Sequence, residues 1–214
     1  MNRLGILGGS FDPIHFGHLR CAEEIRQRFS FEKILFIPTY VPPHKPAESV
    51  LAYRHRKNMT RIAIDTNPYF MLEDIEEQLP IPSYTYRTIE ALLRKYGSDA
   101  NLHFIIGEDD FANMHTWHSP LSIVQSCSIM VITRRNPDKT LSELLPVDFK
   151  DEFCYSEKEG VLVHKRGKKV YLSSLPMLDI SSSVIRASVR QRLSVRYLTS
   201  DPVIEYMEKE KLYY

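Results

Sequence analysis

The stretch Gly8–His18, with the sequence GGSFDPIHFGH, joins two patterns that together indicate the fold. Before it, Arg3–Leu7 is a short apolar run that ends at two glycines, which predicts a buried strand. After it, a helix is predicted from His18, with one apolar face made of Leu19, Ala22, Ile25 and Phe29. Lys33–Ile37 is a second apolar run, closed by a proline. A strand, a helix and a strand at this spacing predict a parallel pair with a right-handed crossover.

The alternation of strands and helices continues through the middle of the chain. Helical patterns cover residues 53–66, 85–96 and about 120–125. Strand-like runs cover residues 70–75, 101–106 and 128–133. Strands that alternate with helices predict an α/β fold, here a Rossmann-like, doubly wound, mostly parallel sheet.

The last third of the chain is less regular. Residues 136–178 contain two β-like runs, at 161–164 and 169–172, and are interpreted as an insertion or an extension of the sheet. Residues 181–214 form a C-terminal helical part. Its first helix, at 181–192, opens with three serines, which favour N-caps; its second, at 202–212, is expected to use Asp201 as N-cap.

Composition excludes several classes of function. The chain has 214 residues, 43% hydrophobic and 26% charged, with 28 Lys plus Arg against 27 Asp plus Glu, for a net charge of +1. A near-neutral chain lacks the basic excess expected of a nucleic-acid or membrane binder. Its apolar runs are too short to cross a bilayer. The three cysteines (Cys21, Cys127 and Cys154) are far apart, which favours thiols packed as small core residues in a reducing, cytoplasmic compartment.

The Gly8–His18 stretch also carries the most informative chemistry. Four of the eight glycines fall in the first 17 residues, at the carboxyl end of the first strand, where open α/β sheets bind ligands. The stretch is neither a G-x-x-x-x-G-K-[ST] loop nor a G-x-G-x-x-G loop. Instead His15 and His18 flank a helix N-terminus, whose free N–H groups and dipole suit a phosphate. The alternative is a zinc pair or two surface histidines; zinc-binding helices more often space their histidines four apart.

Two motifs together resemble those of a known superfamily. Gly9–His18 resembles the nucleotidyltransferase signature related to the H-I-G-H motif of class I aminoacyl-tRNA synthetases. Ile180–Arg186, with the sequence ISSSVIR, is similar to the I-S-S-T-x-I-R hallmark of the same enzymes, with Ser183 in place of Thr. The resemblance implies one nucleotidyltransferase domain over residues 1–214.

Four further segments resemble the bacterial nicotinate-nucleotide adenylyltransferases. They have the sequences PPHK (42–45), SYT (83–85), IGED (106–109) and MHTW (114–117), and the C-terminal PVxxY and LY also fit. Arg87 and Glu108 depart from the family pattern, which usually has Asp and a small residue there. Arg87 is expected to be solvated.

The resemblance implies a set of site residues. The catalytic set is His15, His18, Lys45 and Arg186. The ATP-binding set is Gly8, Gly9, Ser10, Phe11, Gly17, Gly107, Asp109, Ile180, Ser181, Ser182 and Ser183. The set for nicotinate mononucleotide is His44, Tyr84, Thr85, Trp117 and Arg134.

Each candidate also has an ordinary structural interpretation. Without a functional role, Lys45 would be an ordinary surface lysine and Arg186 would belong to a solvated helix face. Asp109 and Thr85 could simply cap helices. Trp117, the one tryptophan, could be a packing residue rather than a platform for a pyridinium ring.

The implied reaction is direct in-line transfer. The phosphate of nicotinate mononucleotide attacks the α-phosphorus of ATP, and pyrophosphate leaves, with Mg²⁺ carried on the phosphates and no metal held by the protein alone. No reactive nucleophile or paired carboxylates are evident from the sequence. The alternatives are another phosphate acceptor (nicotinamide mononucleotide or phosphopantetheine) and a non-catalytic nucleotide-sensing module. Partners are ATP and the mononucleotide, without nucleic acid or membrane, and a homo-oligomer is left open.

Overall fold

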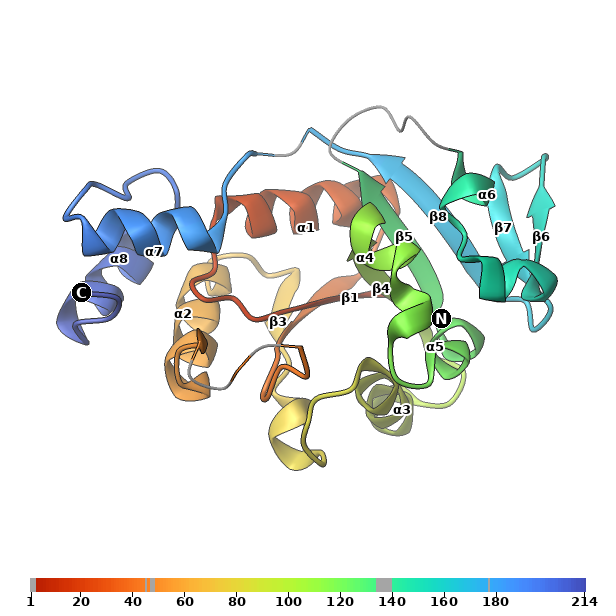
Figure 1. The fold of residues 1–214 in the computed structure, drawn as a ribbon, viewed down its shortest axis with the longest axis horizontal. Coiled ribbons are helices and arrows are strands. Elements are labelled where there is room, and N and C mark those ends of the chain that lie inside the picture. The colour runs from red at the N-terminus through yellow and green to blue at the C-terminus, as the bar shows by residue number, and fades with distance from the viewer. Residues whose placement is uncertain (1–2, 45, 47–48, 134–139, 177) are drawn as a thin grey trace. The chain divides into compact units, whose positions relative to one another are not determined.

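The computed structural model describes residues 3–44, 46, 49–133, 140–176 and 178–214 (Figure 1). The chain divides into two compact units. The first contains Met1–Leu7 and Tyr84–Pro176, and the second contains Gly8–Ser83 and Met177–Tyr214. The prediction of a single nucleotidyltransferase domain over residues 1–214 stays a prediction.

The strands follow the order β3-β2-β1-β4-β5-β8-β7-β6 in an eight-stranded sheet. Four of its pairs are parallel (β1–β4, β2–β3, β4–β5 and β5–β8), and the pairs β6–β7 and β7–β8 are antiparallel. The mostly parallel α/β sheet expected from the sequence is therefore confirmed. Its inner strands are nearly continuous apolar runs, as strands covered on both faces must be.

The first unit carries most of these strands. They are β1 (Arg3–Gly9), β4 (Asn101–Gly107), β5 (Ser128–Thr133), β6 (Phe153–Ser156), β7 (Val161–His164) and β8 (Lys169–Ser174). In the parallel register, Leu7 lies opposite Ile105 and Ile105 opposite Met130. The region expected to be irregular thus adds β8 beside β5 and the antiparallel β7 and β6 beyond it (Figure 1).

Helices precede or connect the strands of the first unit after β1. They are α3 (Thr85–Tyr96), α4 (Glu108–Ala112), α5 (Pro120–Ser126) and α6 (Leu141–Leu144), with 3₁₀ turns at Met114–Thr116 and Val147–Glu152. The end of α3 is set by Gly97, whose φ of +103° is disfavoured for other residues.

The second unit holds two strands, one of them at an edge of the sheet, and the longest helix described. Its strands are β2 (Lys33–Pro38) and β3 (Phe70–Leu72), and its helices are α1 (Phe16–Arg28), α2 (Tyr53–Ile64), α7 (Ser182–Arg190) and α8 (Asp201–Lys209), with a 3₁₀ turn at Ile75–Gln78. Apolar side chains from each of these helices are fully buried, among them Ile25, Met59, Ile185 and Val203. This core supports the loop that leads from β1 to α1.

Several boundaries differ from the sequence prediction. β1 continues through Gly8 and Gly9 instead of ending before them, because glycine tolerates extended backbone where no side chain has to pack. The strand expected at 70–75 ends at Leu72, and the helix expected at 181–192 ends at Arg190. Ser200, not Asp201, is the N-cap of α8. β6 was not predicted: the first unit's edge strand is short and half exposed.

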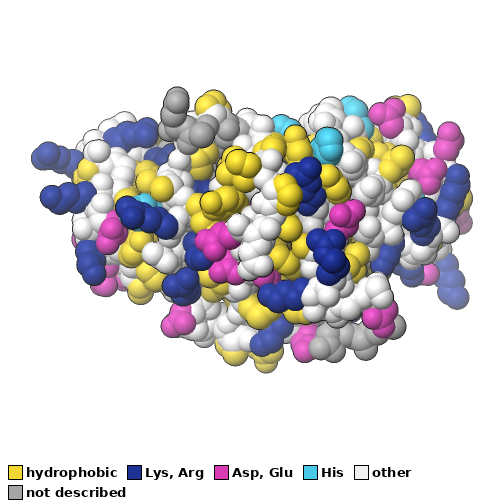
Figure 2. Space-filling view, turned by 90° about the horizontal axis from the view of Figure 1, so that it is seen from below, with side chains coloured by type: hydrophobic (Ala, Val, Ile, Leu, Met, Phe, Trp, Pro, Cys, Tyr) yellow, Lys and Arg dark blue, Asp and Glu magenta, His cyan; other side chains and the backbone are white. Residues whose placement is uncertain are grey.

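Surface charge and cysteines agree only partly with expectation. On the face in Figure 2, Lys and Arg side chains are interspersed with Asp and Glu rather than gathered in one basic patch.

Cys21 and Cys127 are buried, and burial raises the pKa of each thiol to about 12. Cys154 is exposed on β6, so it is not the core residue expected. Among the described residues, no helix is long and apolar enough to cross a membrane.

Candidate active site

The loop from β1 to α1 holds its two histidines at the start of the helix. His15 is the N-cap residue of α1, with extended backbone at φ −149°, and His18 follows in the first turn. Gly17 between them is buried, and a Cβ there would lie 3.0 Å from the His15 ring. Phe11 adopts a left-handed φ of +47°, a conformation that costs a non-glycine residue on the order of 1 kcal/mol or more. The loop is thus a strained, closely packed turn.

The histidine rings lie against each other. Their centroids are 3.7 Å apart with an interplanar angle of 23°, and the edge of Phe11 packs on His18. The backbone N–H of His15 donates to His18 Nδ1 at 3.3 Å. Because Nδ1 accepts this bond, the proton of the neutral His18 ring is on Nε2, where it can be donated to a ligand.

Burial keeps both rings neutral at physiological pH. It lowers the pKa of His15 to about 4. It lowers the pKa of His18 to about 3, and the neighbouring His15 lowers this pKa further. Two neutral imidazoles can donate hydrogen bonds to phosphoryl oxygens, and an approaching phosphate would favour their protonated forms.

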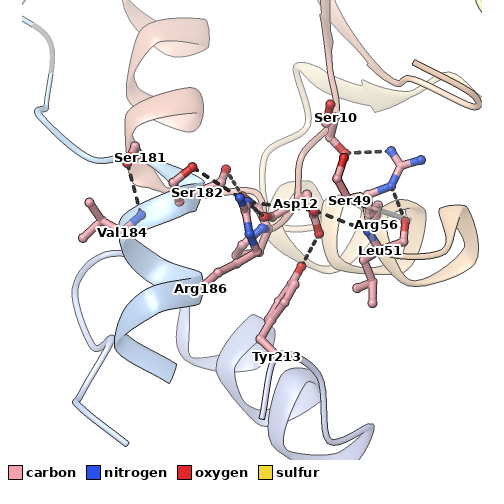
Figure 3. Close-up of polar contacts among 12 residues, drawn as sticks. Ser10, Asp12, Ser49, Leu51, Arg56, Ser181, Ser182, Val184, Arg186 and Tyr213 are labelled. Atoms are coloured by element: carbon pink, nitrogen blue, oxygen red, sulfur yellow. Dashed lines mark hydrogen bonds and ion pairs between the residues drawn. The ribbon is translucent and has the colours of Figure 1, made fainter. Parts of the chain in front are cut away.

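Arg186, from the ISSSVIR segment, contacts this loop (Figure 3). Its Nη1 donates to the backbone carbonyl of Asp12 at 2.7 Å, and its Nη2 donates to Ser183 Oγ at 3.3 Å. Its side chain is 24% exposed, so it retains a face toward solvent. The interpretation of Arg186 as part of a solvated helix face is wrong, because the guanidinium is docked on the loop backbone.

The serines before Arg186 fix α7 to the same loop. Ser181 is the N-cap, and its Oγ accepts from Val184 N at 3.3 Å. Ser182 Oγ donates to the Pro13 carbonyl at 2.9 Å. The remaining backbone N–H groups of the first turn of α7 are therefore held beside the loop, with Ser181 and Ser183 exposed.

A buried polar cluster lies under the loop, and sequence reasoning missed its members. The Asp12 carboxylate accepts from Tyr213 Oη at 2.6 Å and from Leu51 N at 3.3 Å. Arg56 is 1% exposed and donates to the backbone carbonyls of Ser10, Tyr40 and Leu51. Asp12 belongs to the quoted motif, but Arg56 gave no signal in the sequence.

The first unit holds the candidates for the mononucleotide. Tyr84 precedes α3 as its N-cap residue, and Thr85 is the first residue of that helix. The Tyr84 ring stacks on His118 with centroids 4.4 Å apart. Arg87 is half-buried against the Tyr84 ring, so the expectation that it is solvated is wrong. Thr85 makes no side-chain cap, contrary to the alternative considered for it.

The tryptophan is partly accessible. Trp117 follows the 3₁₀ turn Met114–Thr116 and is half-buried, with Phe104 packed edge-to-face at 6.1 Å between ring centroids. One part of the indole is therefore anchored, while another part is open to solvent.

The end of β4 provides a turn close to a helix start. Gly107 is the last residue of β4 and the N-cap of α4, so Asp109 does not cap that helix as the alternative held. Asp109 is exposed and Glu108 is half-buried.

Among the remaining candidates, His44 is exposed. The predictions for Lys45 and Arg134 lie outside the described residues.

The structure brings together one part of the expected set. In the second unit, His15, His18 and Arg186 gather around the Gly8–His18 loop, with Ser182 and Ser183 beside them. Gly107, Tyr84, Thr85 and Trp117 belong to the first unit. Over the part of the chain that is described, no group of three or more His, Cys, Asp or Glu side chains is placed to hold a metal ion.

Comparison with known proteins gives a consistent picture. The cytidylyltransferase-like family matches residues 6–188. A probable nicotinate-nucleotide adenylyltransferase of Geotalea daltonii is 41% identical over 212 residues, covering 99% of this chain and 98% of that protein. One of Citrifermentans bemidjiense is 42% identical with the same coverage. The Plasmodium falciparum nicotinic acid mononucleotide adenylyltransferase complexed with NaAD has a TM-score of 0.75, at 21% identity, over 100% of this chain and 98% of that chain.

Proposed function

The chain belongs to the cytidylyltransferase-like family, among the nicotinate-nucleotide adenylyltransferases, and on this basis we propose that it transfers an adenylyl group from ATP to nicotinate mononucleotide. The products are nicotinate adenine dinucleotide and pyrophosphate, a step of NAD biosynthesis. The observation that carries the proposal is the docking of Arg186 on the loop that holds His15 and His18.

This docking gathers the donors that phosphoryl transfer needs. An oxygen of the mononucleotide phosphate attacks the α-phosphorus of ATP, and the bond from that phosphorus to the bridging oxygen of pyrophosphate breaks. Negative charge accumulates on the transferring group and on the leaving pyrophosphate. Neutral His18 Nε2–H and the Arg186 fork stabilise that charge, and no covalent intermediate with the protein is formed.

The remaining ATP-binding roles follow from the same loop and from α7. Gly8, Gly9, Ser10 and Phe11 present backbone to the nucleotide, and Gly17 lets His15 pack beside the helix start. The first turn of α7, from Ile180 to Ser183, offers N–H groups and hydroxyls to the phosphates. Gly107 and Asp109 contact the adenosine part, and Lys45 adds a positive charge to the phosphates.

The residues assigned to the mononucleotide are His44, Tyr84, Thr85, Trp117 and Arg134. Trp117 stacks on the nicotinate ring through its accessible part. The N–H groups at the start of α3, at Thr85, bind the nicotinate carboxylate with the favourable end of the helix dipole. Tyr84, His44 and Arg134 complete the set.

Mg²⁺ enters with ATP, bound to its phosphate oxygens as Mg²⁺ usually is. The acidic residue of the loop, Asp12, is 4% exposed and is held by hydrogen bonds from Tyr213 and from Leu51, so we do not assign it as a ligand of Mg²⁺. The reaction steps above are therefore assigned to the chain's own residues. The compartment proposed for this biosynthetic step is the cytoplasm.

The proposal is tested by pyrophosphate release from ATP with three acceptors offered separately: nicotinate mononucleotide, nicotinamide mononucleotide and phosphopantetheine. Release with the first at the highest rate supports the proposal. Release only with phosphopantetheine would reassign the substrate, and nucleotide binding without release would favour a sensing module.

A further inference from the structure

The C-terminal end of the chain returns to the Gly8–His18 loop in a defined way. After α8, Leu212 N donates to the Met207 carbonyl at 2.9 Å and Lys211 N to the Glu208 carbonyl at 3.2 Å, with Lys211 at φ +53°. This is the hydrogen-bond pattern of a Schellman cap, and Leu212 is buried at the position that usually makes its apolar contact. The turn directs the next residue, Tyr213, back toward the loop.

Tyr213 bonds the one carboxylate in the loop. Its Oη donates to Asp12 Oδ1 at 2.6 Å, a short bond of the kind expected between a hydroxyl and a carboxylate (Figure 3). Leu51 N donates to the other oxygen, Asp12 Oδ2, at 3.3 Å. Two donors of the protein therefore hold the carboxylate in a fixed orientation.

The orientation of Asp12 affects Arg186. Arg186 Nη1 donates to the backbone carbonyl of Asp12, and the same atom lies 3.9 Å from Asp12 Oδ2. This is a long ion pair rather than a hydrogen bond. Without the Tyr213 hydroxyl, the Asp12 carboxylate would lose one donor while it stays 4% exposed beside the Arg186 guanidinium. It would then turn toward that guanidinium, because a buried charge needs a partner. Arg186 would then be occupied by Asp12 and withdrawn from a ligand.

We propose that Tyr213 is a positioning residue that holds Asp12 away from Arg186 and so keeps the guanidinium available to the phosphates of ATP. This inference rests on the proposed function. Tyr213 touches no reacting atom; it acts through Asp12 and Arg186. The interaction that Tyr213 serves is the recognition of the ATP triphosphate by the Arg186 guanidinium. That guanidinium is held in place by the backbone carbonyl of Asp12.

The C-terminal segment has a second attachment, which supplies a matched control. Tyr206 Oη lies 3.0 Å from His55 Nδ1 and accepts from Asn58 Nδ2 at 3.1 Å, both on α2. Tyr206→Phe therefore removes hydrogen bonds of the same segment without touching Asp12. Tyr214, which is 67% exposed, supplies a silent control as Tyr214→Phe.

The test compares pyrophosphate release by the full chain and its variants at 25 °C, with ATP and nicotinate mononucleotide varied in turn. For Tyr213→Phe we expect kcat/KM for ATP to fall at least ~10-fold, with KM for the mononucleotide within about twofold of the parent. Tyr206→Phe and Tyr214→Phe should stay within about threefold of the parent in both parameters. A Tyr213→Phe variant with parental kcat/KM for ATP would overturn the inference.

A double-variant measurement separates positioning from loss of structure. In an Arg186→Ala background, Tyr213→Phe should have less than a twofold further effect, because the residue through which it acts is gone. A full additional ~10-fold loss would overturn the inference in favour of a general structural role. If the parent chain itself releases no pyrophosphate with any acceptor, the proposed function fails, and the inference fails with it. If the parent is active and Tyr213→Phe is equally active, the inference alone fails.

Discussion

At the scale of single residues, the proposed chemistry depends on two histidines that the fold keeps uncharged. His18 accepts a hydrogen bond at Nδ1 from the backbone of His15, which leaves its Nε2–H as a donor. Burial lowers the pKa of His18 to about 3, so this donor form is present throughout the physiological range. A neutral donor gains strength as negative charge develops on its acceptor, which favours the transition state over the bound substrate.

Replacement of His18 by Ala is therefore expected to lower kcat at least ~100-fold while KM for ATP changes little. Pyrophosphate release under saturating substrates measures this, with Arg20→Ala, an exposed position of the same helix, as the control. A kcat within a few-fold of the parent would show that His18 has no role in transfer.

The same low pKa values predict a pH dependence of stability. The usual histidine pKa is 6.5, and burial lowers the pKa of His15 to about 4 in the folded chain. Below about pH 6.5 the unfolded chain therefore binds protons that the folded chain does not. The free energy of unfolding should fall as pH is lowered from 6.5 toward 4, by up to about 1.4 kcal/mol per pH unit for each such histidine.

Urea unfolding between pH 7 and pH 4.5 measures this slope. His18→Gln, which cannot titrate there, should have a shallower slope than the parent by about the contribution of one histidine. Other buried histidines such as His103, whose pKa burial lowers to about 4, contribute equally to both proteins. Equal slopes in the two proteins would contradict the buried, neutral state of His18.

At the scale of elements, α7 positions a planar donor fork rather than a point charge. Arg186 uses one nitrogen for the Asp12 carbonyl and the other for Ser183 Oγ, so both arms of the guanidinium are oriented. Lysine in the same place keeps the charge but cannot make two fixed bonds.

For Arg186→Lys we therefore expect only partial activity, above that of Arg186→Ala and at least ~10-fold below the parent in kcat/KM for ATP. Arg190→Lys, an exposed position of the same helix, is the matched control and should match the parent. Parental activity in Arg186→Lys would mean that a positive charge alone suffices at this position. If Arg186→Ala depended on ATP concentration as the parent does, Arg186 would have no role in ATP binding.

The elements were predictable to different degrees. The period of apolar residues located β5 and α3 at their observed bounds, because both present clear buried faces. It placed the start of α1 at His18, although the helix begins at Phe16, because glycine and proline in the loop obscure the boundary. β6 was missed: a four-residue strand with one buried position, Phe153, leaves too short a pattern to detect.

At the scale of the whole molecule, the sequence predicted the class of fold and the family, and both are confirmed. The residues of the candidate site that lie close together in the second unit were predictable only where a motif is contiguous. His15 and His18 stand three apart in one segment, and Arg186 lies in a second motif of the same family pattern. The support beneath them was not predictable, because Arg56 bonds backbone carbonyls and Tyr213 meets Asp12 across 201 positions of the chain. Neither contact leaves a local pattern.

The central claim is the transfer of an adenylyl group to the nicotinate form of the mononucleotide. Nicotinate and nicotinamide differ by a carboxylate against a neutral amide, so discrimination has to come from donors that favour negative charge. In the proposed site the N–H groups at the start of α3 are these donors, whereas stacking on Trp117 would accept either ring. A lost hydrogen bond to a charged group corresponds to about 1.5–3 kcal/mol, which is a preference of at least ~10-fold.

The most direct measurement is kcat/KM for nicotinate mononucleotide and for nicotinamide mononucleotide, each with the same saturating ATP and Mg²⁺. We expect the nicotinate form to be preferred at least ~10-fold, with nicotinate adenine dinucleotide and pyrophosphate formed in equal amounts. Comparable kcat/KM values for the two mononucleotides would contradict the nicotinate assignment, and the absence of a dinucleotide product with either would contradict adenylyl transfer itself.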